Sequence, residues 1–161
     1  MNVLKIAIMN AAQFHLMFTH LPIVGLGFAI LFNAVALYRK SEELQKLSLW
    51  FYLILGVCGL LAYMTGDDAG EIMKTYPGIT EDIIEPHENI ALFFFIGLMV
   101  TSVLSIIGLY LAKTKKHLLK RFSVCLLVIA LLVGTLAVRT GSTGGAIRHT
   151  EIKQGAFKKA N

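Results

Sequence analysis

The chain has 161 residues, of which 56% are hydrophobic, and its mean hydropathy is +0.69. Soluble domains are about 45–50% apolar, so this composition indicates a membrane protein. The formal net charge of +5 does not indicate nucleic-acid binding, because the cations are divided among short segments beside apolar runs and the tail.

Four apolar runs, taken in chain order, are long enough to cross a bilayer. They cover residues 16–38, 47–65, 90–112 and 122–140. A hydrocarbon core of ~30 Å needs about 20 residues of helix, and backbone groups in lipid must be paired within the segment. The sequence therefore predicts a single all-α domain over residues 1–161, an integral membrane four-helix bundle.

The charges between the runs predict the orientation. The short links 39–46 and 113–121 carry eight Lys or Arg, whereas the long link 66–89 carries only Lys74. The positive-inside rule puts the short links in the cytoplasm, and both termini and the long link outside. The outer side is then acidic, either for solvation or for docking a basic soluble partner. Seven of the ten acids lie there: Asp67, Asp68, Glu71, Glu81, Asp82, Glu85 and Glu88.

Short repeats relate the two halves of the chain. "HLPI" (20–23) opens the first run and "HENI" (87–90) the third, while "TGDDAGEI" (65–72) and "TGSTGGAI" (140–147) follow the second and fourth. This predicts two helical hairpins in tandem, related by a pseudo-two-fold axis along the membrane normal. The axis would bring the histidines of "HLPI" and "HENI" to equal depth.

Each Gly-rich phrase contains a Gly-x-x-x-Gly step, Gly66 to Gly70 and Gly141 to Gly145. Such steps allow close contact between helices; alternatively, the missing side chains leave room for a flat cofactor. Either use predicts that Leu at Gly70 or Gly145 is more damaging than Leu at Gly56.

Four of the five histidines map to the outer end: His15, His20, His87 and His149. The fifth, His117, lies in a basic link. Ionisable side chains at membrane depth usually face a cavity or a partner. His15 and His20 are five residues apart, about 140° around a helix of 3.6 residues per turn, so they should have different roles.

These histidines suggest a haem site, because b-type haem takes two imidazoles from facing helices of a bundle. We predict His20 and His87 as the axial pair, with His149 and His15 as second choices or as propionate and partner contacts. Covalent haem attachment is excluded because the chain has no Cys-x-x-Cys-His motif. Arg139 would pair with a cofactor carboxylate or with Asp67 or Asp68.

A bare-metal site is the alternative use of the same residues. Two or three histidines together with Asp67, Asp68 or Glu71 would suit zinc, copper or iron. Motifs for hydrolases and nucleotide triphosphatases are missing from the sequence.

The segments "FHLMFTHLPIVGLGFAILFNAVAL" (14–37) and "GGAIRH" (144–149) resemble a family of small four-helix bacterial inner-membrane proteins of unassigned function. Some members are joined to Rieske iron–sulfur domains, so the resemblance implies a bacterial cytoplasmic membrane and a redox setting. It marks His15, His20, His87 and His149. The chain departs from the family in "HLP", where "HFP" is common, and in Thr-Glu after His149, where Gly is usual.

Together these observations predict a b-type cytochrome subunit that transfers electrons at the outer side of the membrane, rather than a stand-alone enzyme. Its partners would be membrane lipid and either a redox complex or a basic electron carrier. The alternatives are a non-haem metal-binding membrane protein and a purely structural subunit of a larger complex.

Overall fold

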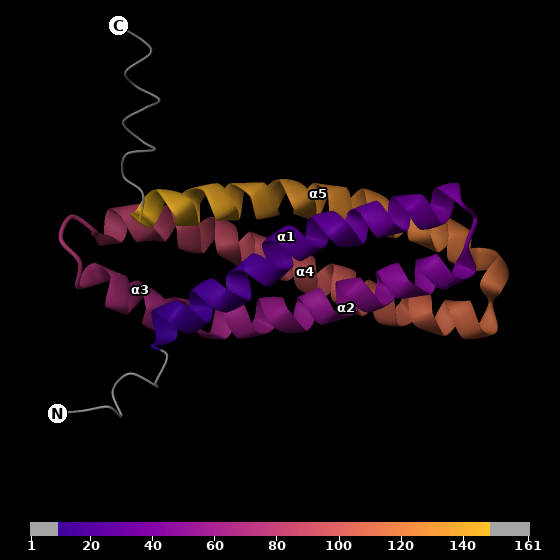
Figure 1. Cartoon of the computed structure of the whole chain (residues 1–161), viewed down its shortest axis with the longest axis horizontal. Helices are drawn as coiled ribbons and strands as arrows, with labels where there is room; N and C mark the ends of the chain where they lie inside the picture. The colour runs from indigo at the N-terminus through magenta and orange to yellow at the C-terminus, as the bar shows by residue number, and fades with distance from the viewer. Residues whose placement is uncertain (1–9, 149–161) are drawn as a thin grey trace, which may run out of the picture.

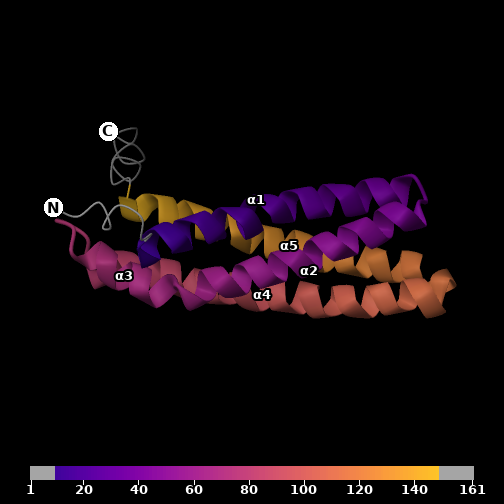
Figure 2. The same ribbon diagram turned by 60° about the horizontal axis from the view of Figure 1, so that its bottom comes forward.

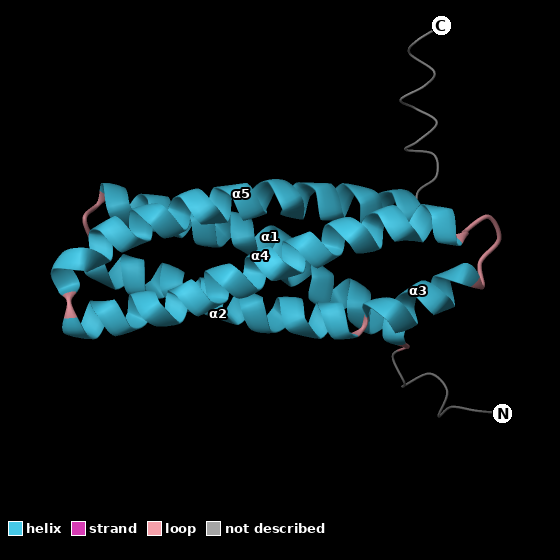
Figure 3. Ribbon diagram, turned by 180° about the vertical axis from the view of Figure 1, so that it is seen from behind, coloured by secondary structure: helices cyan, strands magenta, loops and turns pink. Residues whose placement is uncertain are grey.

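The computed structural model of the chain describes residues 10–148 and folds them into five helices. Strands are missing from this described range, and short connections join the helices (Figure 3). The all-α prediction is therefore confirmed. The helices are α1 Ala11–Tyr38, α2 Glu42–Met64, α3 Gly66–Lys74, α4 Glu81–Thr114 and α5 Lys116–Arg148.

Four of these helices, α1, α2, α4 and α5, are long and apolar enough to cross a membrane. Large apolar side chains cover their outer faces; Val24, Ile54, Val103 and Leu132 are 56%, 56%, 58% and 65% exposed. Water would disfavour such a surface, whereas hydrocarbon accepts it. The protein is therefore a multi-pass membrane protein whose helix bundle presents apolar side chains to lipid.

The long helices lie lengthwise beside one another, with both tight turns at one end and α3 at the other (Figures 1 and 2). α1 packs mainly against α2 and α5, and α4 packs against the same two helices. α1 and α4 are thus diagonal partners. This cyclic order is the one that a two-fold axis along the bundle requires, because the axis exchanges hairpin α1–α2 with hairpin α4–α5.

At the end that carries α3, the helices α1, α4 and α5 extend beyond the predicted apolar runs. Residues 66–89, expected to be a link, contain α3 and the first turns of α4, and the second Gly-rich phrase (140–147) continues α5. Charge explains part of the difference, because Asp67, Asp68, Glu81 and Asp82 lie in first helical turns, where carboxylates favour the helix. A hydropathy profile, in contrast, treats the same charged residues as interruptions of an apolar run.

Side chains just before α1 and α2 cap the N-termini of these two helices. The Asn10 side chain accepts a hydrogen bond from the Gln13 amide at 2.9 Å, and the Gln13 side chain accepts one from the Asn10 amide at 3.1 Å. Ser41 caps α2 by accepting from the Leu44 amide at 3.3 Å. Lys40, in the turn between them, has a positive φ of 53°.

Polar side chains tie three helices together in the half of the bundle near the tight turns. Asn33 of α1 donates to the Ser123 carbonyl of α5 at 3.2 Å, and Ser123 donates to the Gln45 side chain of α2, also at 3.2 Å. All three are buried. Asn33 also approaches the buried Tyr52 hydroxyl, although that hydroxyl and Asn33 Oδ1 make no hydrogen bond of regular geometry. These contacts fix how the two hairpins meet.

Glycines allow the closest helix approaches in the middle of the bundle rather than in the repeated phrases. A β-carbon at Gly56 would lie 2.5 Å from Ser102 Cβ, and one at Gly97 would lie 2.8 Å from Val133 Cγ2. One at Gly145 would meet nothing within 4 Å, and one at Gly70 would meet a flexible Glu88 oxygen at 3.3 Å. This packing favours Gly56, rather than Gly70 or Gly145, as the position most sensitive to Leu, the reverse of the expectation from the repeated phrases.

We predict that Gly56→Leu lowers the thermal unfolding midpoint of the detergent-solubilised protein far more than Gly145→Leu. Overpacking a tight core contact costs about 1–3 kcal/mol or more, whereas Gly145 has open space for a side chain. Equal midpoints for the two variants would contradict the packing described for α2 against α4.

Candidate functional site

His15 lies near the α3 end of the bundle, at the start of α1, and faces the end of α2. Its Nδ1 is 2.9 Å from the Ala62 carbonyl oxygen, and Thr65 Oγ1 is 3.4 Å from the same nitrogen. A carbonyl oxygen only accepts, so Nδ1 carries the proton and donates it. The half-buried ring is thus held to α2, and its Nε2 keeps a free lone pair.

His87 occupies the corresponding place in the second hairpin. Its Nδ1 is 3.0 Å from Thr143 Oγ1 of α5. The Thr143 hydroxyl donates its single proton within α5, where the Arg139 and Thr140 carbonyls both lie at 3.1 Å. Thr143 therefore accepts from His87, which again places the proton on Nδ1 and the lone pair on Nε2.

The two half-buried imidazoles belong to diagonal helices, α1 and α4, and are close enough to interact electrostatically. Each is bonded to the helix that follows it in its own hairpin, α2 or α5. His15 and His87 thus have similar surroundings in the two hairpins, whereas the sequence repeat had aligned His20 with His87. One inward-facing histidine from each hairpin thus lies at this end of the bundle.

His20, the axial ligand predicted from the sequence, lies on the outside of α1. It is exposed, and its Nδ1 is 2.5 Å from the Leu16 carbonyl of its own helix. The reason is the five-residue spacing, about 140° around the helix, which turns His20 outward when His15 faces inward. The structure therefore replaces His20 with His15 in the inward-facing pair.

The glycines of the repeated phrases differ in their surroundings. Gly66 lies beside His15, where a β-carbon would be 3.6 Å from Cε1, and Gly141 lies beside Ile23, at 3.7 Å. Gly144 makes the closest approach, because a β-carbon there would be 3.0 Å from His87 Cε1. The sequence reading singled out Gly145 instead; the signal for Gly144 was only its place in a Gly-Gly pair.

The remaining predicted site residues are not brought to the two rings. Arg139 is exposed on α5, and within residues 10–148 it forms no ion pair with Asp67 or Asp68. His149 lies outside the described residues. His117 is exposed at the opposite end of the bundle.

The described residues contain no group of three or more His, Cys, Asp and Glu side chains that could hold a metal ion. Asp67, Asp68 and Glu71, which the sequence offered as metal ligands, are exposed on α3. The described site therefore supplies a pair of imidazoles, without the third protein ligand that zinc sites require.

An ion-pair cluster holds the far end of α3 to the start of α4. The Lys74 ammonium lies 2.8 Å from a Glu71 oxygen and also pairs with Glu81 across the loop between the two helices. Hydrogen bonds to these two carboxylates raise the pKa of Lys74. The single charge of Lys74 offsets only one of these two carboxylates, so the cluster keeps a net negative charge. Asp67, Asp68 and Glu85 are exposed on the same end.

Comparison of the chain with protein-family models, curated proteins and solved structures found no match.

We predict that Gly144→Ala shifts the imidazole ¹⁵N NMR signals of His87, while Gly145→Ala leaves them unchanged. A β-carbon 3.0 Å from Cε1 forces the ring to move by a few tenths of an ångström, whereas Gly145 faces open space. Both changes replace glycine by a better helix former, so their effects on helix propensity cancel in the comparison. Equal shifts would show that Gly144 does not pack on this ring.

Proposed function

We propose that the protein is a b-type cytochrome subunit that binds haem through His15 and His87 and carries electrons at the α3 end of the bundle. One observation carries the proposal. Two imidazoles from diagonal helices each donate Nδ1–H to an oxygen of the neighbouring helix, which leaves both Nε2 atoms available as ligands.

This hydrogen-bonding pattern is typical of metal-ligating histidines, because the second bond fixes the tautomer and the ring orientation. The number of imidazoles also favours haem over a bare ion. Haem iron needs only two protein ligands when both are axial histidines, whereas zinc sites take three or four. When bound, the haem would supply one-electron chemistry.

Other features of the same level fit a bound polar cofactor. Gly66 and Gly144 place backbone rather than side chains against the two rings. The Thr140 backbone lies close to His87, and the buried Thr140 Oγ1 has no hydrogen-bond partner among the described residues. Arg139, the preceding residue, forms no ion pair within residues 10–148, and its guanidinium would suit a haem propionate.

The acidic surface beside the site suits a redox partner. Asp67 and Asp68 project from α3, whose first residue, Gly66, lies against His15. Carboxylates here would steer a basic soluble electron carrier, or a basic face of a larger redox complex, toward the haem end. The protein would then be an electron-transfer subunit rather than a stand-alone enzyme.

We predict that protein purified from haem-replete cells shows a low-spin bis-histidine haem b spectrum, and that His15→Ala and His87→Ala each abolish it. Each change removes one of the two iron ligands. The matched controls are His20→Ala, on the outer face of α1, and His117→Ala, at the opposite end; both should retain the spectrum. Absorption spectra of the oxidised and dithionite-reduced forms make the measurement.

Several outcomes would contradict the assignment. If His20→Ala abolishes the spectrum and His15→Ala does not, the outward histidine is the ligand. Colourless protein with stoichiometric zinc or copper would indicate a non-haem metal site. Protein with neither haem nor metal would indicate a structural subunit of a larger complex.

The proposal extends to a location in the bacterial cytoplasmic membrane. The resemblance of segments 14–37 and 144–149 to a bacterial family supports this membrane, and the basic turns support the orientation of the protein in it. The α3 end would face the periplasm and the tight turns the cytoplasm.

We predict that a single cysteine at Asp68 reacts with a membrane-impermeant maleimide on spheroplasts, while one at Glu43 reacts only after the cells are opened. Both positions are exposed and lie at opposite ends of the bundle. Cys58 and Cys125 are replaced by Ala beforehand. Labelling of the Glu43 position on intact spheroplasts would indicate the opposite orientation.

A further inference from the structure

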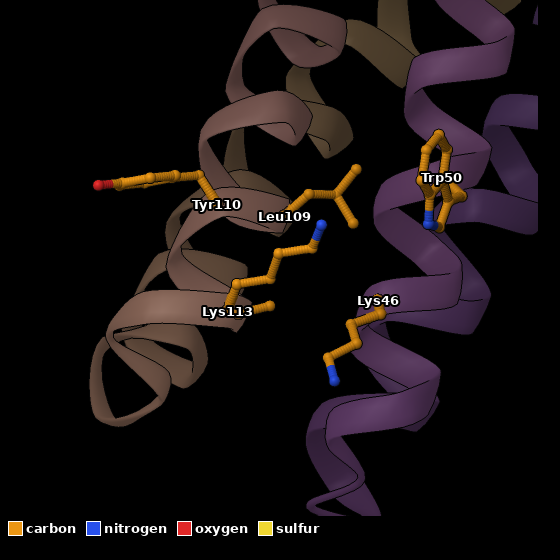
Figure 4. Close-up of a pocket in the computed structure, with 6 residues that line it drawn as sticks. Lys46, Trp50, Leu109, Tyr110 and Lys113 are labelled. Carbon is orange, nitrogen blue, oxygen red and sulfur yellow. The ribbon is translucent and has the colours of Figure 1, made fainter.

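A groove opens between α2 and α4 near the tight turns, at the end opposite the histidines. Its volume is about 390 Å³. Figure 4 shows Leu109 and Lys113 of α4 extending toward α2, which carries Lys46 and Trp50, whereas Tyr110 points away from α2. The groove is lined by Lys46, Trp50, Leu109, Tyr110, Ala112 and Lys113.

The groove combines apolar, aromatic and cationic side chains. Leu109 and Trp50 lie on opposite sides, the Lys113 ammonium extends to the level of Leu109, and the Lys46 ammonium points toward the tight turns (Figure 4). Trp50 and Tyr110 are 53% and 63% exposed. Trp and Tyr favour the level of lipid headgroups, where their rings lie beside acyl chains and their polar atoms reach water.

The two groove lysines carry uncompensated charge. Within the described residues neither Lys46 nor Lys113 forms an ion pair. The nearby acid Glu42 pairs with Lys116, at 3.3 Å, on the α5 side of the turn. Links 39–46 and 113–121 together contain eight Lys or Arg and only two Glu, so the positive potential extends across this end.

We propose that this groove binds an anionic glycerophospholipid. Its phosphate would lie within reach of the flexible Lys46 and Lys113 side chains, and its glycerol and carbonyl groups beside Trp50. An acyl chain would follow Leu109 toward the apolar middle of the bundle. Basic grooves between membrane helices are suited to anionic headgroups, because the charges pair in a partly dehydrated setting. The groove is independent of the haem proposal, since it uses none of the same residues.

The single tryptophan of the chain is Trp50, so its fluorescence reports directly on the groove. The test reconstitutes the full-length protein in vesicles with phosphatidylglycerol and phosphatidylcholine in equal amounts. In one set the phosphatidylglycerol chains are brominated, and in the other set the phosphatidylcholine chains are brominated. Bromine quenches tryptophan only at short range, and the ratio of the two quenching curves gives the relative affinity of the two lipids for the groove.

We expect phosphatidylglycerol to be preferred by roughly five- to thirtyfold, since each lysine near a membrane surface contributes about fivefold for anionic lipid. Lys46→Gln with Lys113→Gln should reduce the preference to about that of bulk lipid. Lys46→Arg with Lys113→Arg, which keeps both charges, should retain most of it. Circular dichroism of each variant checks that the helices remain folded.

The matched control is Lys115→Gln with Arg121→Gln, which removes two charges from the same end but outside the groove. It should leave the preference within about twofold of the unchanged protein, because uniform surface potential decays over the Debye length. Equal quenching by the two lipids in the unchanged protein would overturn the proposal. An equal loss in the control and the groove variant would also overturn it, by showing that general surface charge sets the preference. If soluble glycerol phosphate abolished the preference for phosphatidylglycerol, the ligand would be a free phosphate compound rather than a lipid.

Discussion

Backbone amides and carbonyls in lipid have no water to bond, and the rest of this structure depends on that constraint. Each membrane-crossing segment must be a complete helix, so the tertiary structure is decided by how the helices touch. Apolar side chains bind lipid as well as they bind one another, and contact therefore relies on close approach. Gly56 and Gly97 provide that approach in the middle of the bundle. The buried amide–hydroxyl chain from Asn33 through Ser123 to Gln45 adds directional bonds nearer the tight turns.

The same constraint places the candidate site. Side chains that need hydrogen bonds can be buried only where an oxygen is available, and in a bundle the available oxygens lie at helix ends or on hydroxyl side chains. His15 uses the Ala62 carbonyl near the end of α2, and His87 uses the Thr143 hydroxyl near the end of α5. The diagonal arrangement of α1 and α4 then brings the two rings to the same level. The site is thus a consequence of hairpin packing rather than of a local sequence motif.

The bundle has two chemically different ends. The α3 end combines imidazoles with exposed carboxylates, and the other end combines lysines with Trp50 and Tyr110. An apolar middle separates them, including Leu26, Leu98 and Leu126, each 1% exposed. This separation is suited to a protein that exchanges electrons on one face and is anchored to anionic lipid on the other, as we propose. It also means that the two proposals can fail independently.

The sequence by itself determined the four spanning helices, their antiparallel order and the end at which the histidines gather, because hydropathy and charge act locally along the chain. The five-residue spacing also places His15 and His20 about 140° apart around α1. Only one of the two can therefore face inward. The choice between them needed the tertiary structure, since it depends on which face of α1 meets α2. The same holds for Gly144 beside His87 and for the tight contact at Gly56. Those positions are decided by neighbours tens of residues away, and the periodicity of a single helix carries no information about them.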